Sequence, residues 1–249
     1  MKVVTDENLE YFKGKQDAFN EGKFALKDEV GDVGVATPEA AGIVKPSTDF
    51  DVAADGTLSL YKAMAVNSFT VSPSQAERGS TVADATLKWA LSKVPTTLTL
   101  NDGPVTVTDT QKVVSGANLT SDTTYTLKAT DARGASAQRS ATVYFRDKRH
   151  WFTGAYDADA VTDEVLNAAT GELATSRSKT FTVEAGEGQH IFYAFPHAWG
   201  TPAFFVGGFE GGFSLLKTFD HVNASGASVS YDVYKSTNAG LGQTTVEVK

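Results

Sequence analysis

Histidine is the residue type of this sequence best suited to metal binding or proton transfer. The four histidines are His150, His190, His197 and His221. Their spacing fits neither H-E-x-x-H nor another metal-ligand pattern, and the chain contains no cysteine that could complete a thiolate site. We therefore expect no metal site. His190 and His197 are seven residues apart, across a strand and a Pro turn, and are expected to be surface or turn histidines with ordinary hydrogen-bond partners.

Paired carboxylates could also do chemistry, because glycoside hydrolysis uses two of them. The segment YDADAVTDEVL carries Asp157, Asp159, Asp163 and Glu164. No aromatic platform is adjacent in sequence, and an acidic run of this kind is typical of a solvated surface. The G-x-S-x-G pattern of a serine nucleophile is missing as well. We predict no catalytic residue, no cofactor and no enzyme activity.

A glycine-rich run, GGFEGGF at residues 207–213, would cradle a phosphate if it opened a helix. It contains neither G-x-x-x-x-G-K-S/T nor G-x-G-x-x-G, and no helical pattern follows it. We expect a glycine-lined loop or bulge between buried strands.

Aromatic side chains near the C-terminus offer a better-supported binding chemistry. Aromatic faces stack on sugar rings and give a large contact area at low entropic cost. The candidates for ligand binding are Trp199, Phe209, Phe213, Tyr231 and Tyr234. Membership of the β core is the alternative for each of them.

Charge and hydropathy exclude several classes of function. The net charge of −8 disfavours nucleic-acid binding, which needs clustered Lys and Arg. No apolar run approaches the roughly 18 residues of a membrane helix, and MKVVTDENLEYF lacks the apolar region of a secretion signal. The absence of cysteine favours assembly in a reducing compartment. One basic cluster, in FRDKRHWF at 145–152, is expected to be a polar junction between domains.

Composition predicts a mainly β protein with one N-terminal helix. Thr, Val, Ser, Gly and aromatic residues dominate after residue 65. Residues 5–30 read as a helix with Leu9, Phe12 and Phe19 at a/d-like spacing. A lone helix is marginal in water, so this stripe needs a partner. One possibility is that the helix packs on the downstream domain of its own chain. The interpretation that we favour is an anchor or oligomerisation helix.

The stretch GIVKPSTDFDVAADGTLSLY, residues 42–61, predicts a β-hairpin. A three-residue loop with a bulge at Gly56 sets Phe50 opposite Leu60 and Val52 opposite Leu58. All four apolar side chains then share one face. A two-stranded hairpin is barely stable alone, and the flanking sequence offers only Ile43, Val44 and alanines as cover. Other copies of the chain are the expected cover.

At this point the sequence resembles bacteriophage fibre and virion structural proteins, over residues 1–62. The matching residues are Ala36, Thr37, Gly42, Ile43, Val44, Lys45, Pro46, Val52, Asp55, Gly56, Thr57, Leu58 and Ser59. In that family the segment belongs to a homotrimeric, intertwined shaft. The run NLEYFKGKQDAFNEGKF is similar to segments that attach the fibre to the particle.

Residues 66–147 predict a β-sandwich. We expect a strand ending at Pro73, and a strand in 81–92 with Ala85, Leu87, Trp89 and Leu91 inward. A two-residue Asp102-Gly103 loop would pair Leu100 with Val105 and Leu98 with Val107. A second hairpin around DARG would oppose Tyr125, Leu127 and Ala129 to residues 142–145. A Trp on an early strand and a Tyr on a late one fit an immunoglobulin-like sandwich. The order is also similar to Ig-like modules of phage surface proteins.

Residues 148–249 predict a second, sandwich-like β domain. Phe181 and Val183 precede a Gly-rich turn and a strand with Ile191, Tyr193 and Phe195. The run AFFVGG at 203–208 suits a strand buried on both faces. Two alternating segments, ASVSYDVYKS and TTVEVK, would close the sheet.

These observations predict four parts: an N-terminal helical particle anchor (1–30), a trimeric hairpin shaft (31–65), an Ig-like sandwich (66–147) and a C-terminal β tip (148–249). The resemblance implies a homotrimeric head fibre, capsid decoration or short tail or collar fibre of a virion, assembled in the host cytoplasm. Its helix would bind a capsid or tail protein, and its tip a bacterial surface glycan or protein. No nucleic acid and no membrane insertion are expected.

The oligomerisation residues would be Leu9, Phe12, Phe19, Ile43, Val44, Phe50, Val52, Leu58 and Leu60. A bacterial carbohydrate-binding or adhesive β protein is the alternative, and a tip glycan depolymerase a less favoured one.

Overall fold

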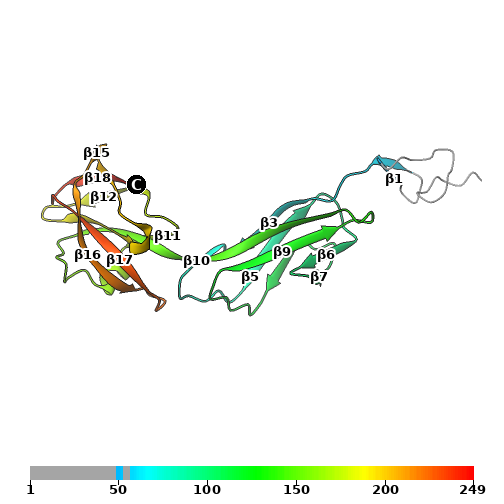
Figure 1. Cartoon of the computed structure of the whole chain (residues 1–249), viewed down its shortest axis with the longest axis horizontal. Helices are drawn as coiled ribbons and strands as arrows, with labels where there is room; N and C mark the ends of the chain where they lie inside the picture. Colours follow the sequence, from blue (N-terminus) through cyan, green and yellow to red (C-terminus); the bar gives the residue numbers. More distant parts are fainter. Residues whose placement is uncertain (1–48, 53–56) are drawn as a thin grey trace, which may run out of the picture. The chain divides into compact units, whose positions relative to one another are not determined.

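The computed structural model describes residues 49–52 and 57–249 (Figure 1). The chain divides into two units, residues 1–62 and 63–249. The predicted helix over 5–30, with Leu9, Phe12 and Phe19, lies outside the described residues, as do Ile43, Val44 and the predicted bulge at Gly56. The described chain is mainly β, as its composition predicts.

The first unit contains the β-hairpin that the sequence predicts. Strand β1 (Phe50–Val52) pairs antiparallel with β2 (Leu58–Leu60). The register places Phe50 opposite Leu60, Asp51 opposite Ser59 and Val52 opposite Leu58. Tyr61 N–H donates to Asp49 C=O at 2.8 Å and extends the pairing by one step. The predicted register is therefore confirmed.

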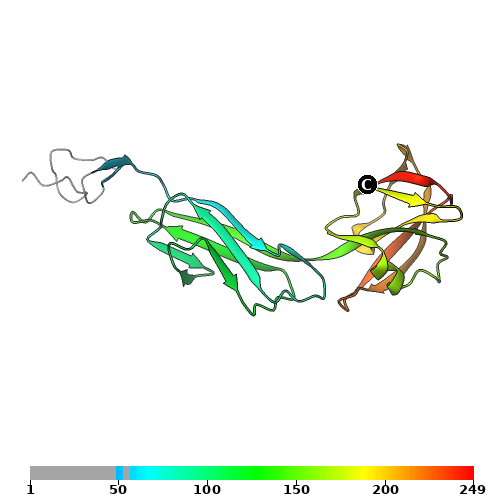
Figure 2. The same cartoon turned by 180° about the vertical axis from the view of Figure 1, so that it is seen from behind.

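The N-terminal part of the second unit is a sandwich of two sheets around one hydrophobic core (Figures 1 and 2). One sheet has the strand order β3-β5-β8, and the other layer has β7-β6-β9-β10. The strands are β3 (Val66–Ser72), β5 (Ala85–Leu91), β6 (Thr97–Leu100), β7 (Gly103–Val105), β8 (Gln111–Val114), β9 (Thr123–Thr130) and β10 (Ser136–Gly154). In addition, β4 (Gln75–Glu77) pairs in parallel with β10.

The alternation predicted for β5 is confirmed. Ala85, Leu87 and Trp89 are buried, whereas Lys88 and Ala90 are exposed. The indole N–H of Trp89 donates to the main-chain oxygen of Asp109 at 2.8 Å, so this large side chain is buried with its polar atom satisfied.

The register predicted for the hairpin of β6 and β7 is wrong. Leu98 lies opposite Val105 and Leu100 opposite Gly103, because the two-residue loop is Asn101-Asp102 rather than Asp102-Gly103. Both loop residues have positive φ, +48° and +63°, which Asn and Asp tolerate. Thr126 N–H donates to Asn101 Oδ1 at 2.8 Å and holds this turn against β9. The observed register differs from the predicted one by two residues. Because side chains alternate between the two faces, the same residues still point inward.

Strand β10 is 19 residues long and passes from the first core into the second. It pairs with β9, and Tyr125, Leu127 and Ala129 lie opposite Ala141, Arg139 and Ala137 rather than residues 142–145 as predicted. Further along, it pairs with β11 (Thr170–Ala174) and β13 (His190–Pro196). The expected boundary at residue 147 therefore falls inside a continuous strand.

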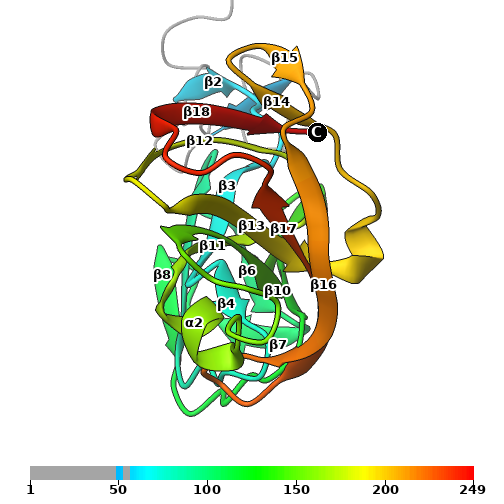
Figure 3. The same ribbon diagram turned by 90° about the vertical axis from the view of Figure 1, so that its left-hand side faces the viewer.

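The C-terminal part holds two layers of strands and one short helix (Figure 3). One layer has the order β16-β17-β13-β10, and the other β12-β18-β14-β15. The remaining elements are α2 (Asp163–Ala168), β12 (Lys179–Ala185), η1 (His197–Trp199), β14 (Phe204–Val206), β15 (Phe209–Glu210), β16 (Phe213–Val222), β17 (Ser228–Ser236) and β18 (Gly242–Val248).

Strand β13 is the centre of this part. Ile191, Tyr193 and Phe195 face the core shared with β12 and β18, whereas Phe192 and Ala194 face the core that Leu166 of α2 closes. The strand buried on both faces is thus β13. The prediction that AFFVGG would be doubly buried is wrong, because Phe205 and Val206 of β14 are only half-buried.

Candidate functional site

The apolar face of the β1–β2 hairpin is accessible to solvent. Leu60 is 73% exposed, Leu58 43% and Phe50 38%. The register places these three side chains on the same face. This arrangement presents an apolar surface in the part of the chain where the sequence predicts contacts between copies.

The five aromatic candidates of the C-terminal domain have different environments. Tyr231 and Tyr234 are buried, at 3% and 9% exposure, so they are core residues and cannot offer a ring face to a ligand. Phe213 and Trp199 are half-buried, and their rings stack on Phe204 and Phe195. Phe209 alone among the five is strongly exposed, at 83%.

Phe209 lies on a short hairpin that we call the Phe209 hairpin, residues 204–212. Val206 pairs with Phe209 across a two-residue turn, Gly207-Gly208, whose φ values are +60° and +86°. Positive φ at both central residues is typical of a type I′ turn, which favours glycine at both positions. Gly211 N–H donates to Phe204 C=O at 2.8 Å and closes the hairpin. The glycine run is therefore a turn, as expected, and no helix follows it, but the strands that it joins are not buried: β15 is exposed and β14 is largely half-buried.

A cavity of about 180 Å³ lies beside this hairpin. Its lining residues are Val206, Phe209, Glu210, Gly211, Gly212, Asn238 and Leu241. Thr237 N–H donates to Gly212 C=O at 2.9 Å and ties the hairpin to the loop that carries Asn238. The cavity thus combines an exposed aromatic ring with a carboxylate and an amide.

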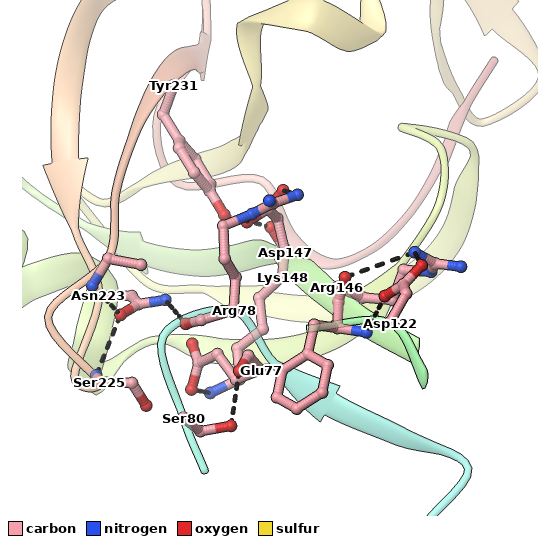
Figure 4. Close-up of polar contacts among 12 residues, drawn as sticks. Glu77, Arg78, Ser80, Asp122, Arg146, Asp147, Lys148, Asn223, Ser225 and Tyr231 are labelled. Atoms are coloured by element: carbon pink, nitrogen blue, oxygen red, sulfur yellow. Dashed lines mark hydrogen bonds and ion pairs between the residues drawn. The ribbon is translucent and has the colours of Figure 1, made fainter. Parts of the chain in front are cut away.

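The arginines and the lysine of the basic cluster on β10 pair with acidic residues, and Arg146 and Lys148 are drawn in Figure 4. Arg146 contacts Asp122 at 3.2 Å, and Lys148 contacts Glu77 at 2.9 Å. Arg149 binds Glu172, whose second oxygen accepts from Lys179 at 2.7 Å. Burial disfavours the charged form of Glu172, but the hydrogen bonds from Lys179 and Arg149 lower its pKa below the ordinary value. Each cation therefore has an acidic partner, which leaves little for a nucleic acid to bind.

The loop after β4 connects the N-terminal sandwich to the C-terminal part through hydrogen bonds of Arg78. Arg78 donates from Nε and Nη2 to the two carboxylate oxygens of Asp147, at 2.9 and 3.1 Å, and this bidentate pairing raises the pKa of Arg78. Asn223, in the β16–β17 turn, donates to Arg78 C=O at 2.8 Å (Figure 4). The Tyr231 hydroxyl donates to Lys148 C=O at 2.7 Å. These bonds fix β10 between its neighbours.

His190 and His197 each have a hydrogen-bond partner, as predicted: the main-chain oxygen of Ser236 for His190 and the Asp232 carboxylate for His197. The other two histidines lie in the core. His150 is 3% exposed and His221 1%, and their rings meet edge-on at 5.9 Å. His221 Nδ1 bonds Asp163 Oδ1 at 2.8 Å, whereas His150 Nδ1 and His221 Nε2 have no partner among the described residues. Burial, together with His221 and Lys148, lowers the pKa of His150 to about 3. Sequence spacing could not have found a pair 71 residues apart.

The acidic segment supplies structural contacts. Asp157 Oδ1 accepts from the backbone N–H groups of Asp159 and Ala160, at 3.1 and 2.9 Å. Asp163 accepts from His221 and from Val222 N–H. Within residues 49–52 and 57–249, no group of three or more His, Asp or Glu side chains is arranged to hold a metal ion. The same ranges contain no helix long and apolar enough to cross a membrane.

Comparison with known proteins gives little. No protein-family model and no curated protein matches the chain. Among solved structures, it is similar to the N-terminal eight Ig domains of Down Syndrome Cell Adhesion Molecule isoform 1.30.30, with a TM-score of 0.23 and 10% identity. The match covers 71% of this chain and spans 23% of that one. A likeness this weak carries no argument about function.

Proposed function

We propose that this protein is a structural virion protein of a bacteriophage, a homotrimeric head fibre or short tail fibre that displays β domains toward the bacterial surface. The observation that supports it most is the β1–β2 hairpin. Phe50, Leu58 and Leu60 share one face and are solvent-accessible in a single chain, with Leu60 73% exposed. Burying a large aliphatic side chain contributes about 1.5–3 kcal/mol, so three copies of this face would gain by associating.

The sandwich built by β3 to β10 would be an Ig-like spacer in this protein. Its two sheets, with Trp89 buried on an early strand and Tyr125 on a later one, support that assignment. The two cores that follow it would form the tip. The ion pairs along β10 favour one fixed arrangement of spacer and tip.

The mechanism would be multivalent display. Three tips on one shaft raise the effective concentration at a repetitive surface, so modest single contacts give strong attachment. Residues 1–30 would bind a capsid or tail protein and leave the tips free.

Light scattering at micromolar concentration tests the assembly. We expect the mass of three chains, and a variant lacking residues 31–62 should lose trimerisation while its downstream β domains stay folded. A monomeric parent chain would refute the trimer. An unchanged trimer in the deletion variant would move the assembly role to another segment.

A bacterial adhesive or carbohydrate-binding β protein is the second candidate, favoured by the exposed ring of Phe209. That protein would bind glycan as a single chain. The same light-scattering measurement therefore separates the two proposals.

A further inference from the structure

The Phe209 hairpin presents an aromatic face that the fold does not use. At 83%, Phe209 is the most exposed large hydrophobic residue in the described part of the chain. The neighbouring ring of Phe213 stacks on Phe204 at 4.2 Å and is thereby held in the core. A side chain so exposed contributes little to the stability of the domain, and because Phe209 also lines the cavity, its ring face is available to a ligand held there.

Two polar side chains beside this ring have open hydrogen-bonding capacity. Glu210 and Asn238 line the same cavity, and neither side chain has a hydrogen-bond or ion-pair partner within residues 57–249. A carboxylate accepts hydrogen bonds, and an amide both donates and accepts them. The wall is pre-formed, because Thr237 N–H to Gly212 C=O at 2.9 Å holds the Asn238 loop against the hairpin.

The size of the cavity limits what it can hold. Its volume of about 180 Å³ is below the roughly 300–1,000 Å³ of sites for drug-sized ligands, so it suits one ring. Val206 and Leu241 add apolar surface, and the glycines at 211 and 212 keep one side free of side chains. A protein partner needs about 800 Å² on each side, so a cavity of about 180 Å³ favours a small ligand.

We propose that this cavity binds a single neutral sugar ring of a bacterial surface glycan. The C–H face of the sugar would pack on Phe209, its hydroxyls would donate to Glu210, and Asn238 would donate to a ring or hydroxyl oxygen. Glu210 disfavours acidic sugars, as does the net charge of −8. The assignment rests on the proposed function, since it names the ligand class of its tip.

The test is a titration of the full-length, ¹⁵N-labelled chain with the methyl glycosides of glucose, galactose, mannose and N-acetylglucosamine, in the millimolar range. We expect at least one of them to shift the amide signals of residues 207–212 and 238. Phe209→Ala should weaken that binding about tenfold and Phe209→Trp should retain it, because ring stacking supplies most of the contact. Asn238→Ala should weaken it several-fold.

Val94→Ala is the matched control, since Val94 is also strongly exposed, at 67%, but lies outside this site. It should bind as the parent does. The proposal is overturned if none of the four glycosides shifts these signals, or if the shifts lie elsewhere. It is also overturned if Phe209→Ala binds unchanged, or if glucuronate binds as tightly as methyl glucoside. Light scattering measures the oligomeric state independently of sugar binding. A monomer that binds sugar would therefore refute the trimer but not this site. A trimer that binds no sugar would refute this site but not the trimer.

Discussion

The imidazole rings of His150 and His221 meet edge-on inside the C-terminal core, with centroids 5.9 Å apart. Tyr231 contacts both rings, at 6.0 and 5.0 Å, and Asp163 holds His221 from α2. Lys148, on the same strand as His150, opposes protonation of His150 further. A buried ring with an unpartnered Nδ1 in this setting is disfavoured as a cation.

Buried His150 predicts that the protein loses stability in acid. An unfolded histidine takes up a proton near pH 6.5, whereas folded His150 does so only near pH 3. Unfolding therefore takes up a proton between these values. The free energy of unfolding should fall by about 1.4 kcal/mol per pH unit from this residue as the pH drops below 6.5. Urea unfolding between about pH 7 and pH 4 measures it.

A substitution isolates the contribution of His150. His150→Leu should reduce the pH slope by about that amount, because leucine fills a similar volume and does not titrate. Phe192→Leu is the control, since Phe192 is also buried in this part of the chain but carries no titratable group, and it should keep the parental slope. An unchanged slope in His150→Leu would assign the acid sensitivity to other groups.

The carboxylate of Asp163 predicts a second effect on stability. Its Oδ1 accepts from His221 and from Val222 N–H, at 2.8 and 3.0 Å. Asp163→Ala leaves both donors without that acceptor and should cost about 1–3 kcal/mol. Asp163→Asn keeps an oxygen there and should cost less. Equal losses in the two variants, measured by urea unfolding, would show that these hydrogen bonds are not the cause.

Local patterns predicted the strands well where apolar and polar residues alternate. The inward set of β5 follows from this period of two, and so does the register of β1 with β2, because the alternative register would mix apolar and polar side chains on each face. The turn between β6 and β7 could not be predicted this way. Its position depends on the bond between Asn101 and Thr126, a residue of another hairpin.

The candidate site was predictable only in part, for the same reason. Residue type marked both Phe209 and Tyr231 as ligand-binding candidates, yet one is 83% exposed and the other 3%. What separates them is the packing of β17 against β13, which connects distant segments. Likewise, the partners of Arg149 and Lys148, Glu172 and Glu77, lie in other strands and cannot be paired from the sequence.

Gly79 lies where the loop after β4 contacts the β16–β17 turn of the C-terminal part, and its substitution tests how tight this contact is. Its φ is +86°, and an added Cβ would lie 2.9 Å from Ala227 Cβ and 3.0 Å from Ser225 C=O in the β16–β17 turn. Gly134 has a similar φ, +79°, but a Cβ there would meet nothing within 4 Å. Gly134→Ala should therefore cost only the conformational strain, about 1–2 kcal/mol. Gly79→Ala should cost about 1–3 kcal/mol more, and equal losses of unfolding free energy would contradict a tight contact there.

Leu60 and Ser59 are adjacent in β2 but lie on opposite faces of the hairpin, which allows a matched test of the proposed trimer. Leu60→Lys places a charge on the apolar face and should shift the chain toward monomer, because three lysines would then meet in the interface. Ser59→Lys makes the same change in charge on the other face, opposite Asp51, and should leave the trimer intact. Light scattering over a concentration series reads both variants. Dissociation by Ser59→Lys alone, or by neither variant, would exclude this face as the contact between chains.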